Sequence, residues 1–168
     1  MAGLHPAKID ESELMNDCDV KRTRGSGPGG QHRNKVETAI VLTHRPTGVM
    51  GTASERRSQK DNQREAMFRL RVNLALEVRY DRDGDQVSDL WKSRCRGGSI
   101  SVNAKHADFP SILAEALDHL STDDMNVKAS AERLGCSVSQ LVKFLKVEPR
   151  ALELVNNRRK ELDLRTLR

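Results

Sequence analysis

A short glycine-rich run constrains this chain more than any other stretch. Residues 25–31 contain four glycines and one proline, a composition that suits neither a helix nor the interior of a strand. The run ends in Gly29, Gly30 and Gln31. Because glycine lacks the Cβ that would block a close backbone approach, we expect a loop that presents backbone N–H groups and one amide side chain to a partner.

The flanks of this run are basic. Residues 20–36 include no acidic residue and carry five cations, Lys21, Arg22, Arg24, Arg33 and Lys35. The ordinary interpretation of such a stretch is a solvated surface turn. The functional interpretation is a loop that contacts a polyanion, because clustered cations neutralise phosphates.

The composition of the whole chain also favours an anionic partner. Its 168 residues include 29 Lys and Arg against 24 Asp and Glu, for a net charge of +5. This excess favours nucleic acid or another anionic surface. Aromatic residues make up only 3%, which argues against recognition of bases by stacking. The length fits one or two small domains.

Cysteines and apolar runs give no sign of a metal or a membrane. Cys18, Cys95 and Cys136 are far apart and form no C-x-x-C motif, so we expect no zinc, no disulfide framework and no cofactor. Reduced cysteines fit a cytoplasmic location. The sequence has no apolar run long enough to span a bilayer and no signal peptide, so we expect no membrane partner.

Hydrophobic periodicity predicts strands and one long helix in the first half of the chain. We expect strands at residues 18–23 and 37–43, and a hairpin partner at 49–53. Ser58 is a candidate N-cap for a helix over 59–79. The polar face of this helix is expected to be mostly solvated and carries Arg64, Arg69, Arg71 and Arg79.

Compact helices are predicted from Phe109 onward, beginning with a helix that has one apolar face. Gly135 is expected to end the second helix, Ser137 to cap the third, and Pro149 to start the fourth. The middle pair has the spacing of a helix-turn-helix. Its second helix offers only Gln140, Lys143 and Lys146 as outward polar groups, too few for base readout, so we expect no DNA partner.

Two blocks of residues together resemble a known family. Gly29-Gly30-Gln31 is followed by His32-x-Asn34 and then Thr38-Ala39-Ile40. The second block contains Thr43-His44-x-Pro46-Thr47-Gly48 and Glu55-Arg56-Arg57-Ser58-Gln59-x-x-Asn62. Over residues 18–78 the chain resembles the class I peptide-chain release factors and their codon-independent relatives, the ribosome-rescue peptidyl-tRNA hydrolases. Gly25 and Arg33 depart from the usual family pattern and bear on the subfamily.

The resemblance implies a chemistry that the sequence alone does not reveal, since no catalytic triad is visible. It implies that Gly29, Gly30 and Gln31 are catalytic and enter the peptidyl-transferase centre of the large ribosomal subunit, beside the P-site peptidyl-tRNA. The backbone N–H of Gln31 would stabilise developing negative charge, and its neutral amide would place water. Residues expected to contact rRNA or tRNA are Arg24, His32, Arg33, Asn34, Lys35, Arg57, Ser58 and Gln59.

The expected fold class is α+β, with a small, mostly antiparallel sheet and one long packed helix, followed by a small all-α module. The expected segments are an N-terminal extension at 1–17, a catalytic domain at 18–84, a linker at 85–107 and a helix-turn-helix-like module at 108–168. Only about 17 residues precede the catalytic domain, so we expect a monomer that acts without reading a stop codon.

The helical module has two interpretations. It either recruits the protein to ribosomes or is a packed, stabilising appendage. The residues expected to recruit are Lys143, Lys146, Arg158, Arg159 and Lys160. Two alternatives to the hydrolase stay open, namely a non-catalytic rRNA-binding module and, less favoured, a DNA-binding regulator. The intact Gly29-Gly30-Gln31 argues against a pure binding role.

Overall fold

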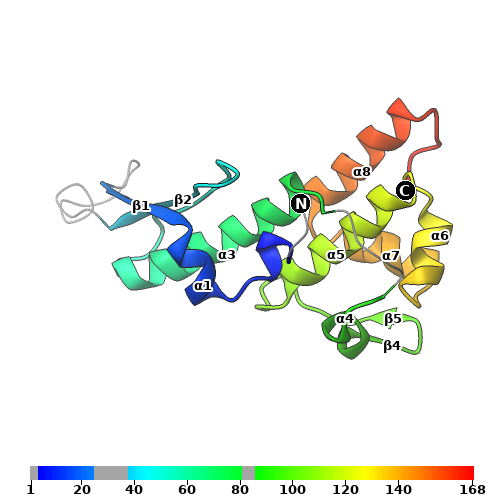
Figure 1. The fold of residues 1–168 in the computed structure, drawn as a ribbon, viewed down its shortest axis with the longest axis horizontal. Coiled ribbons are helices and arrows are strands. Elements are labelled where there is room, and N and C mark those ends of the chain that lie inside the picture. The colour runs from blue at the N-terminus through cyan, green and yellow to red at the C-terminus, as the bar shows by residue number, and fades with distance from the viewer. Residues whose placement is uncertain (1–3, 25–37, 81–85) are drawn as a thin grey trace. The chain divides into compact units, whose positions relative to one another are not determined.

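The computed structural model describes residues 4–24, 38–80 and 86–168 (Figure 1). The chain divides into two compact units, one of residues 6–77 and the other joining the start of the chain to residues from Val78 onward. The fold combines a small antiparallel sheet with helices, so the predicted α+β class is confirmed.

The unit of residues 6–77 is a three-stranded antiparallel sheet packed on one long helix (Figure 1). Its elements are η1 (Pro6–Lys8), α1 (Glu11–Asn16), β1 (Cys18–Thr23), β2 (Ala39–His44), β3 (Met50–Ala53) and α3 (Gln59–Glu77). The strand order is β1-β2-β3, and α3 packs on β2 and β3. The three predicted strands and the long helix are therefore present close to their expected bounds.

A glycine allows the sheet to approach α3 closely. Gly51 is buried on β3 and faces the helix. A Cβ at this position would lie 2.6 Å from the Cβ of Leu70 and even closer to the backbone of Ala66 and Leu70. The backbones of β3 and α3 are thus so close that only glycine fits between them.

Arg71 corrects one expectation about the polar face of α3. We expected that face to be solvated, but Arg71 is only 7% exposed. Its guanidinium donates to the carbonyl of Ala7 in η1 at 3.2 and 3.3 Å and pairs with Glu11 at 3.1 Å. The reason is that η1 packs against α3 here and supplies a carbonyl that needs a donor.

The second unit is a helical bundle with a small hairpin. Its elements are α4 (Asp89–Arg94), β4 (Cys95–Arg96), β5 (Ser99–Ile100), α5 (Phe109–Thr122), α6 (Val127–Arg133), α7 (Val138–Leu145) and α8 (Pro149–Glu161). We expected one apolar face on the first helix of the module, but α5 is buried on all sides from Phe109 to Leu120. It is central because α4, α6 and α8 all pack against it.

Two buried carboxylates on α5 hold segments that enter this bundle. Glu115 accepts hydrogen bonds from the backbone N–H of Ser88 at 2.8 Å and from its hydroxyl at 2.5 Å. Asp118 accepts from the backbone N–H of Tyr80 at 3.2 Å and from Arg79 at 3.5 Å. Because a buried charge without partners is costly, these bonds fix the chain on both sides of residues 81–85 to the same helix.

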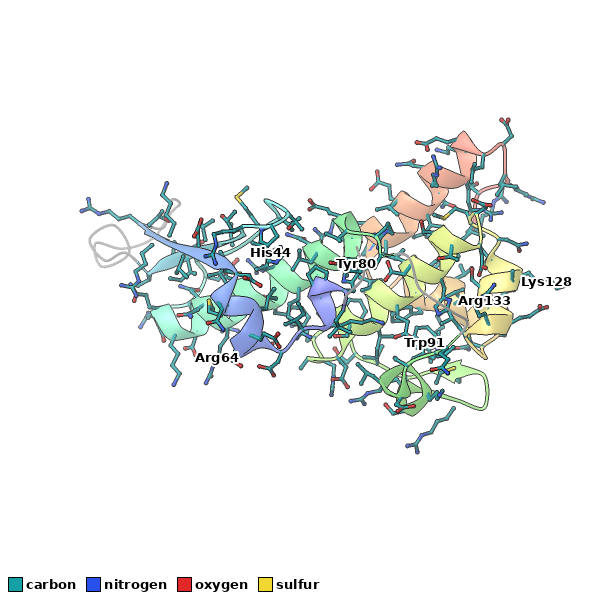
Figure 2. The ribbon with its side chains drawn as sticks, in the orientation of Figure 1. His44, Arg64, Tyr80, Trp91, Lys128 and Arg133 are labelled. Carbon is teal, nitrogen blue, oxygen red and sulfur yellow. The ribbon has the colours of Figure 1, made fainter. Side chains whose placement is uncertain are left out.

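Trp91 ties the segment before α5 into the bundle core (Figure 2). Its side chain is 1% exposed, its indole N–H donates to the carbonyl of Leu134 at 2.8 Å, and its ring meets Phe144 edge-on. Residues 85–107, which we expected to be a linker, thus contain α4 and the β4–β5 hairpin. The division into four segments itself stays a prediction.

Local signals for the helical pair are confirmed. Gly135 has φ +66° and follows the C-cap of α6, and the hydroxyl of Ser137 accepts a hydrogen bond from the N–H of Gln140 at 3.2 Å. Pro149 is the first residue of α8. The helices α6 and α7 therefore follow one another across a short turn, and their assignment as a helix-turn-helix stays a prediction.

The three cysteines are free thiols. Burial raises the pKa of Cys18 and of Cys95, and it raises the pKa of Cys136 from 9.0 to about 11. Among the described helices, none combines the length and apolarity needed to cross a bilayer. No three metal-ligating side chains gather anywhere in the described ranges.

Candidate functional site

The predicted catalytic residues fall outside the part of the chain that the structure describes. These are Gly29, Gly30 and Gln31, and the same holds for four of the predicted RNA contacts, His32, Arg33, Asn34 and Lys35. The structure does describe the framework on both sides of them, residues up to Arg24 and from Thr38 onward. The site is therefore built here from that framework.

Two neighbouring strand ends flank the glycine-rich segment. Thr23, the last residue of β1, pairs with Ala39, the first residue of β2. Because β1 and β2 are antiparallel, the chain leaves and re-enters the sheet at the same corner. The exposed Arg24 follows Thr23 and brings positive charge to this corner.

A buried amide joins this corner to the loop before α3. Asn62 is 0% exposed, and its side-chain NH₂ donates to the carbonyls of Thr38 at 2.6 Å and Arg56 at 2.9 Å. Its side-chain oxygen accepts from the backbone N–H of Arg56 at 2.9 Å. Asn62 belongs to the second block of the family resemblance, but the sequence did not indicate its partners. It fixes the re-entry of the glycine-rich segment to residues 55–58.

An ion pair between Arg69 and Glu55 also fixes the loop before α3. Arg69 on α3 donates to Glu55 at 2.8 Å and to the carbonyl of Thr52 at 2.8 Å. The second oxygen of Glu55 accepts from the backbone N–H of Ser54 at 3.0 Å. The hydrogen bond from Arg69 is the main cause that lowers the pKa of Glu55. Glu55 is thus a structural carboxylate that stays ionised, with both oxygens engaged.

The cavity at this corner is small. Its volume is about 200 Å³. It is lined by residues of β1, β2 and β3 and by the ion pair: Thr23, Arg24, Ala39, Ile40, Val41, Thr52, Ala53, Ser54, Glu55 and Arg69. Pockets for small-molecule ligands usually measure about 300–1,000 Å³. The framework is therefore suited to holding a loop in place and does not enclose a substrate by itself.

The second predicted contact region, Arg57 to Gln59, is exposed. The hydroxyl of Ser58 accepts from the N–H of Asp61 at 3.3 Å, so Ser58 acts at least as a helix cap. Asn62 brings this loop to the same corner as the strand ends. Exposed cations at this end of the unit are Lys21, Arg22, Arg24, Arg56, Arg57 and Lys60.

The block around His44 forms the turn between β2 and β3. The N–H groups of Thr47 and Gly48 donate to the His44 carbonyl at 3.2 and 2.8 Å, and Gly48 has φ +73°. The His44 ring lies 2.7 Å from the Thr47 hydroxyl and is 3% exposed (Figure 2). Burial lowers the pKa of His44, so the ring is neutral near pH 7. The surroundings of His44 thus indicate a structural role for this residue.

The lysines predicted to recruit the protein are in the bundle. Lys143 and Lys146 are exposed on α7, and Lys160 is exposed on α8. None of the three forms an ion pair or a side-chain hydrogen bond with another described residue. They are therefore available to an external anion.

Arg158 and Arg159, which were also predicted to recruit the protein, bond to other groups of the protein. Arg158 pairs with Glu161 at 2.7 Å. Arg159 donates to the carbonyl of Arg165 at 2.8 Å and to that of Met125 at 2.5 Å. The sequence placed both in a basic stretch but did not reveal these partners, which lie up to 34 residues away.

Comparison with known proteins gives a consistent result for the first two thirds of the chain. Residues 7–109 match the family model described as the RF-1 domain. A relative from Malacoplasma penetrans (strain HF-2), "Peptide chain release factor 1", is 36% identical over 106 residues. The protein of the same name from Acetivibrio thermocellus is 35% identical over 103 residues. "Peptide chain release factor PrfB1, chloroplastic" from Arabidopsis thaliana is 42% identical over 88 residues.

These matches cover more of this chain than of the relatives. The first two cover 61% of this chain but 29% and 28% of the relatives, and the third covers 48% of this chain and 19% of the relative. The chain thus matches less than a third of each relative's length.

Proposed function

Because this chain belongs to the class I peptide-chain release factor family, with an RF-1 domain at residues 7–109, we propose that it hydrolyses the ester of peptidyl-tRNA on the ribosome. The observation that carries the proposal is the corner at Thr23 and Ala39. Paired strand ends, the buried amide of Asn62 and the Arg69–Glu55 ion pair fix the flanks of the segment that contains Gly29-Gly30-Gln31.

The proposed chemistry needs little from side chains. The backbone N–H of Gln31 stabilises the negative charge that develops as water attacks the ester carbonyl, as an oxyanion hole does. Its side-chain amide places that water, and Gly29 and Gly30 allow the backbone to approach. The ribosome supplies the remaining environment, which fits a framework with a cavity of only about 200 Å³.

The proposed partners are the rRNA of the peptidyl-transferase centre and the P-site peptidyl-tRNA. Arg24 and Arg57, which are exposed at the same end of the unit, neutralise phosphates there together with Arg33 and Lys35. The polar groups of His32, Asn34, Ser58 and Gln59 complete the proposed contact surface. Binding of this kind weakens strongly as salt rises, because neutralised phosphates release counterions.

We propose further that release requires no stop codon and that the protein acts as a monomer in the cytoplasm. The two sequence blocks fit this proposal, since they resemble the codon-independent rescue hydrolases as well as the release factors that read stop codons. The test adds purified protein to stalled ribosome–nascent-chain complexes whose mRNA carries no stop codon in the A site. We expect release of the nascent peptide. Release at stop codons only would refute the codon-independent form, and no release at either would refute the hydrolase.

A single substitution separates hydrolysis from simple binding. Gln31→Ala is expected to reduce peptide release by orders of magnitude while ribosome co-sedimentation stays near wild type. Gln63→Ala, at an exposed position on α3, is the matched control and should change neither. Equal loss of binding and release in Gln31→Ala would favour the alternative, a non-catalytic rRNA-binding module.

A further inference from the structure

The helical unit contains an open basic groove of about 600 Å³ between α7 and the last described residues. Its lining is Val138, Ser139, Val142, Lys143, Lys146, Arg165, Thr166, Leu167 and Arg168. Four of these nine residues are cations and none is acidic. The sequence indicated Lys143 and Lys146, whereas the two arginines come from residues that follow the last helix.

Two side chains of α8 hold the wall of this groove in place. Asn156 accepts from the backbone N–H of Leu167 at 2.7 Å and donates to its carbonyl at 3.1 Å. Arg159 donates to the carbonyls of Arg165 and Met125. Residues 165–167 are thus fixed by backbone hydrogen bonds on both sides of Thr166. Asn156 and Arg159 are positioning residues, since their polar groups are engaged with the backbone and not with the groove.

The four cations of the groove have no partner among the residues that the structure describes. Within residues 4–24, 38–80 and 86–168, Lys143, Lys146, Arg165 and Arg168 form no ion pair and no side-chain hydrogen bond. Other arginines of the same unit do face a carboxylate: Arg94, Arg133, Arg150 and Arg158. Cations that line one groove repel one another, and a bound polyanion relieves that repulsion.

The shape of the groove favours a single strand over a duplex. A helix that reads DNA must protrude into a major groove about 12 Å wide. Here one wall of the groove is formed by Val138, Val142 and Lys146, and residues 165–168 form the other wall. The helix α7 therefore does not protrude on that side. A sugar–phosphate backbone fits such a groove, with its phosphates at the cations and its sugars against apolar side chains.

We propose that this groove binds the backbone of single-stranded RNA, independently of base identity. The proposal deepens the proposed function, on which the choice of RNA as the polyanion rests. It assigns Lys143, Lys146, Arg165 and Arg168 as phosphate contacts.

The first test measures the affinity of the full-length chain for a fluorescent 12-nucleotide oligouridine across a salt series. The variant is Lys143→Gln/Lys146→Gln, and the control is Lys105→Gln/Lys128→Gln. The control removes the same charge from exposed positions outside the groove, and Figure 2 shows Lys128 projecting from α6. Loss of two phosphate contacts should reduce the slope of log K against log salt by about 1.4. The control should keep the wild-type slope.

The second test changes no charge. Asn156→Ala removes both bonds to Leu167, so Leu167 and the neighbouring Arg168 lose their fixed positions, while Arg159 still holds the carbonyl of Arg165. We expect weaker binding of the oligouridine and a smaller salt slope, with the helical circular dichroism signal retained. The double variant Arg165→Gln/Arg168→Gln should also weaken binding and reduce the salt slope, and it leaves the backbone contacts intact. It therefore tests the proposal even if Asn156→Ala fails to fold.

Several results would overturn the proposal. Wild-type RNA affinity in both groove double variants would show that the groove is not the site. Equal or tighter binding of a 12-base-pair DNA duplex would favour the DNA-binding alternative. Competition by poly-glutamate at equal charge concentration would show that any polyanion suffices. The RNA is free of ribosomes in these assays, so a failure of peptide release on ribosomes would leave the proposal for the groove untouched.

Discussion

Asn62 shows at the scale of one residue how a buried amide organises a site that it does not belong to. It makes three hydrogen bonds to two backbone segments that are 6 and 24 residues away. Because its side chain is fully buried, those backbone groups have no water to replace a missing partner. The amide therefore controls the geometry of the corner at which the chain re-enters the sheet after the segment with the proposed catalytic residues.

Replacement of Asn62 by alanine should destabilise the protein and impair release. Unsatisfied buried groups cost about 1–3 kcal/mol each, so we expect the free energy of unfolding to fall by that order in urea titration. Peptide release at a temperature where the variant remains folded should fall as well. Gln63→Ala is the neighbouring control. A variant that is destabilised but fully active would remove Asn62 from the positioning of the site.

His44 gives the protein a stability that depends on pH. Burial lowers its pKa in the folded state below the ordinary 6.5, so the unfolded state takes up the proton first as pH falls. The free energy of unfolding should therefore decrease as pH falls below about 6.5. Urea titrations at pH 7.5 and 5.5 should show a larger loss for wild type than for His44→Gln, which cannot titrate. Equal losses would mean that groups other than His44 cause the decrease.

At the scale of elements, the contact between β3 and α3 depends on Gly51. Gly51→Ala would force a Cβ against backbone atoms of the helix, which cannot shift without moving α3. Overpacking of this kind costs typically about 1–3 kcal/mol. We expect a lower midpoint in urea unfolding, whereas Met50→Ala, with a side chain that is 54% exposed, should have little effect. Unchanged stability of Gly51→Ala would show that the sheet and helix can separate freely.

The elements also show which features a sequence reveals. The bounds of β1 and α3 followed from alternation, spacing and the cap at Ser58, which are all local signals. The burial of Arg71 could not be predicted in this way, because its partner Ala7 lies 64 residues upstream. The same holds for α5, whose polar residues Glu115 and Asp118 are covered by segments distant in sequence.

At the scale of the whole molecule, the family could be predicted from the sequence, but the contacts that position the candidate site could not. The resemblance of residues 18–78 to release factors is confirmed by the RF-1 domain match at residues 7–109. The parts that position the site were not predictable, since Asn62 bonds the backbone of Thr38, 24 residues away, and Glu55 pairs with Arg69, 14 residues away. The distribution of charge was likewise not predictable. The composition gives the net excess of cations, but only the fold distinguishes the arginines that pair with carboxylates from those that line the groove.

The raised pKa values of the three thiols have a practical consequence for spectroscopy. With the pKa of Cys136 raised to about 11, its thiolate population near neutral pH is about a hundredfold lower than that of a thiol with the ordinary value of 9.0. Cys18 and Cys95 are shifted in the same direction. A cysteine introduced by Lys128→Cys on the exposed side of α6 should therefore react with maleimide dyes well before the native three. Fluorescent reporters can then be attached without first deleting any cysteine.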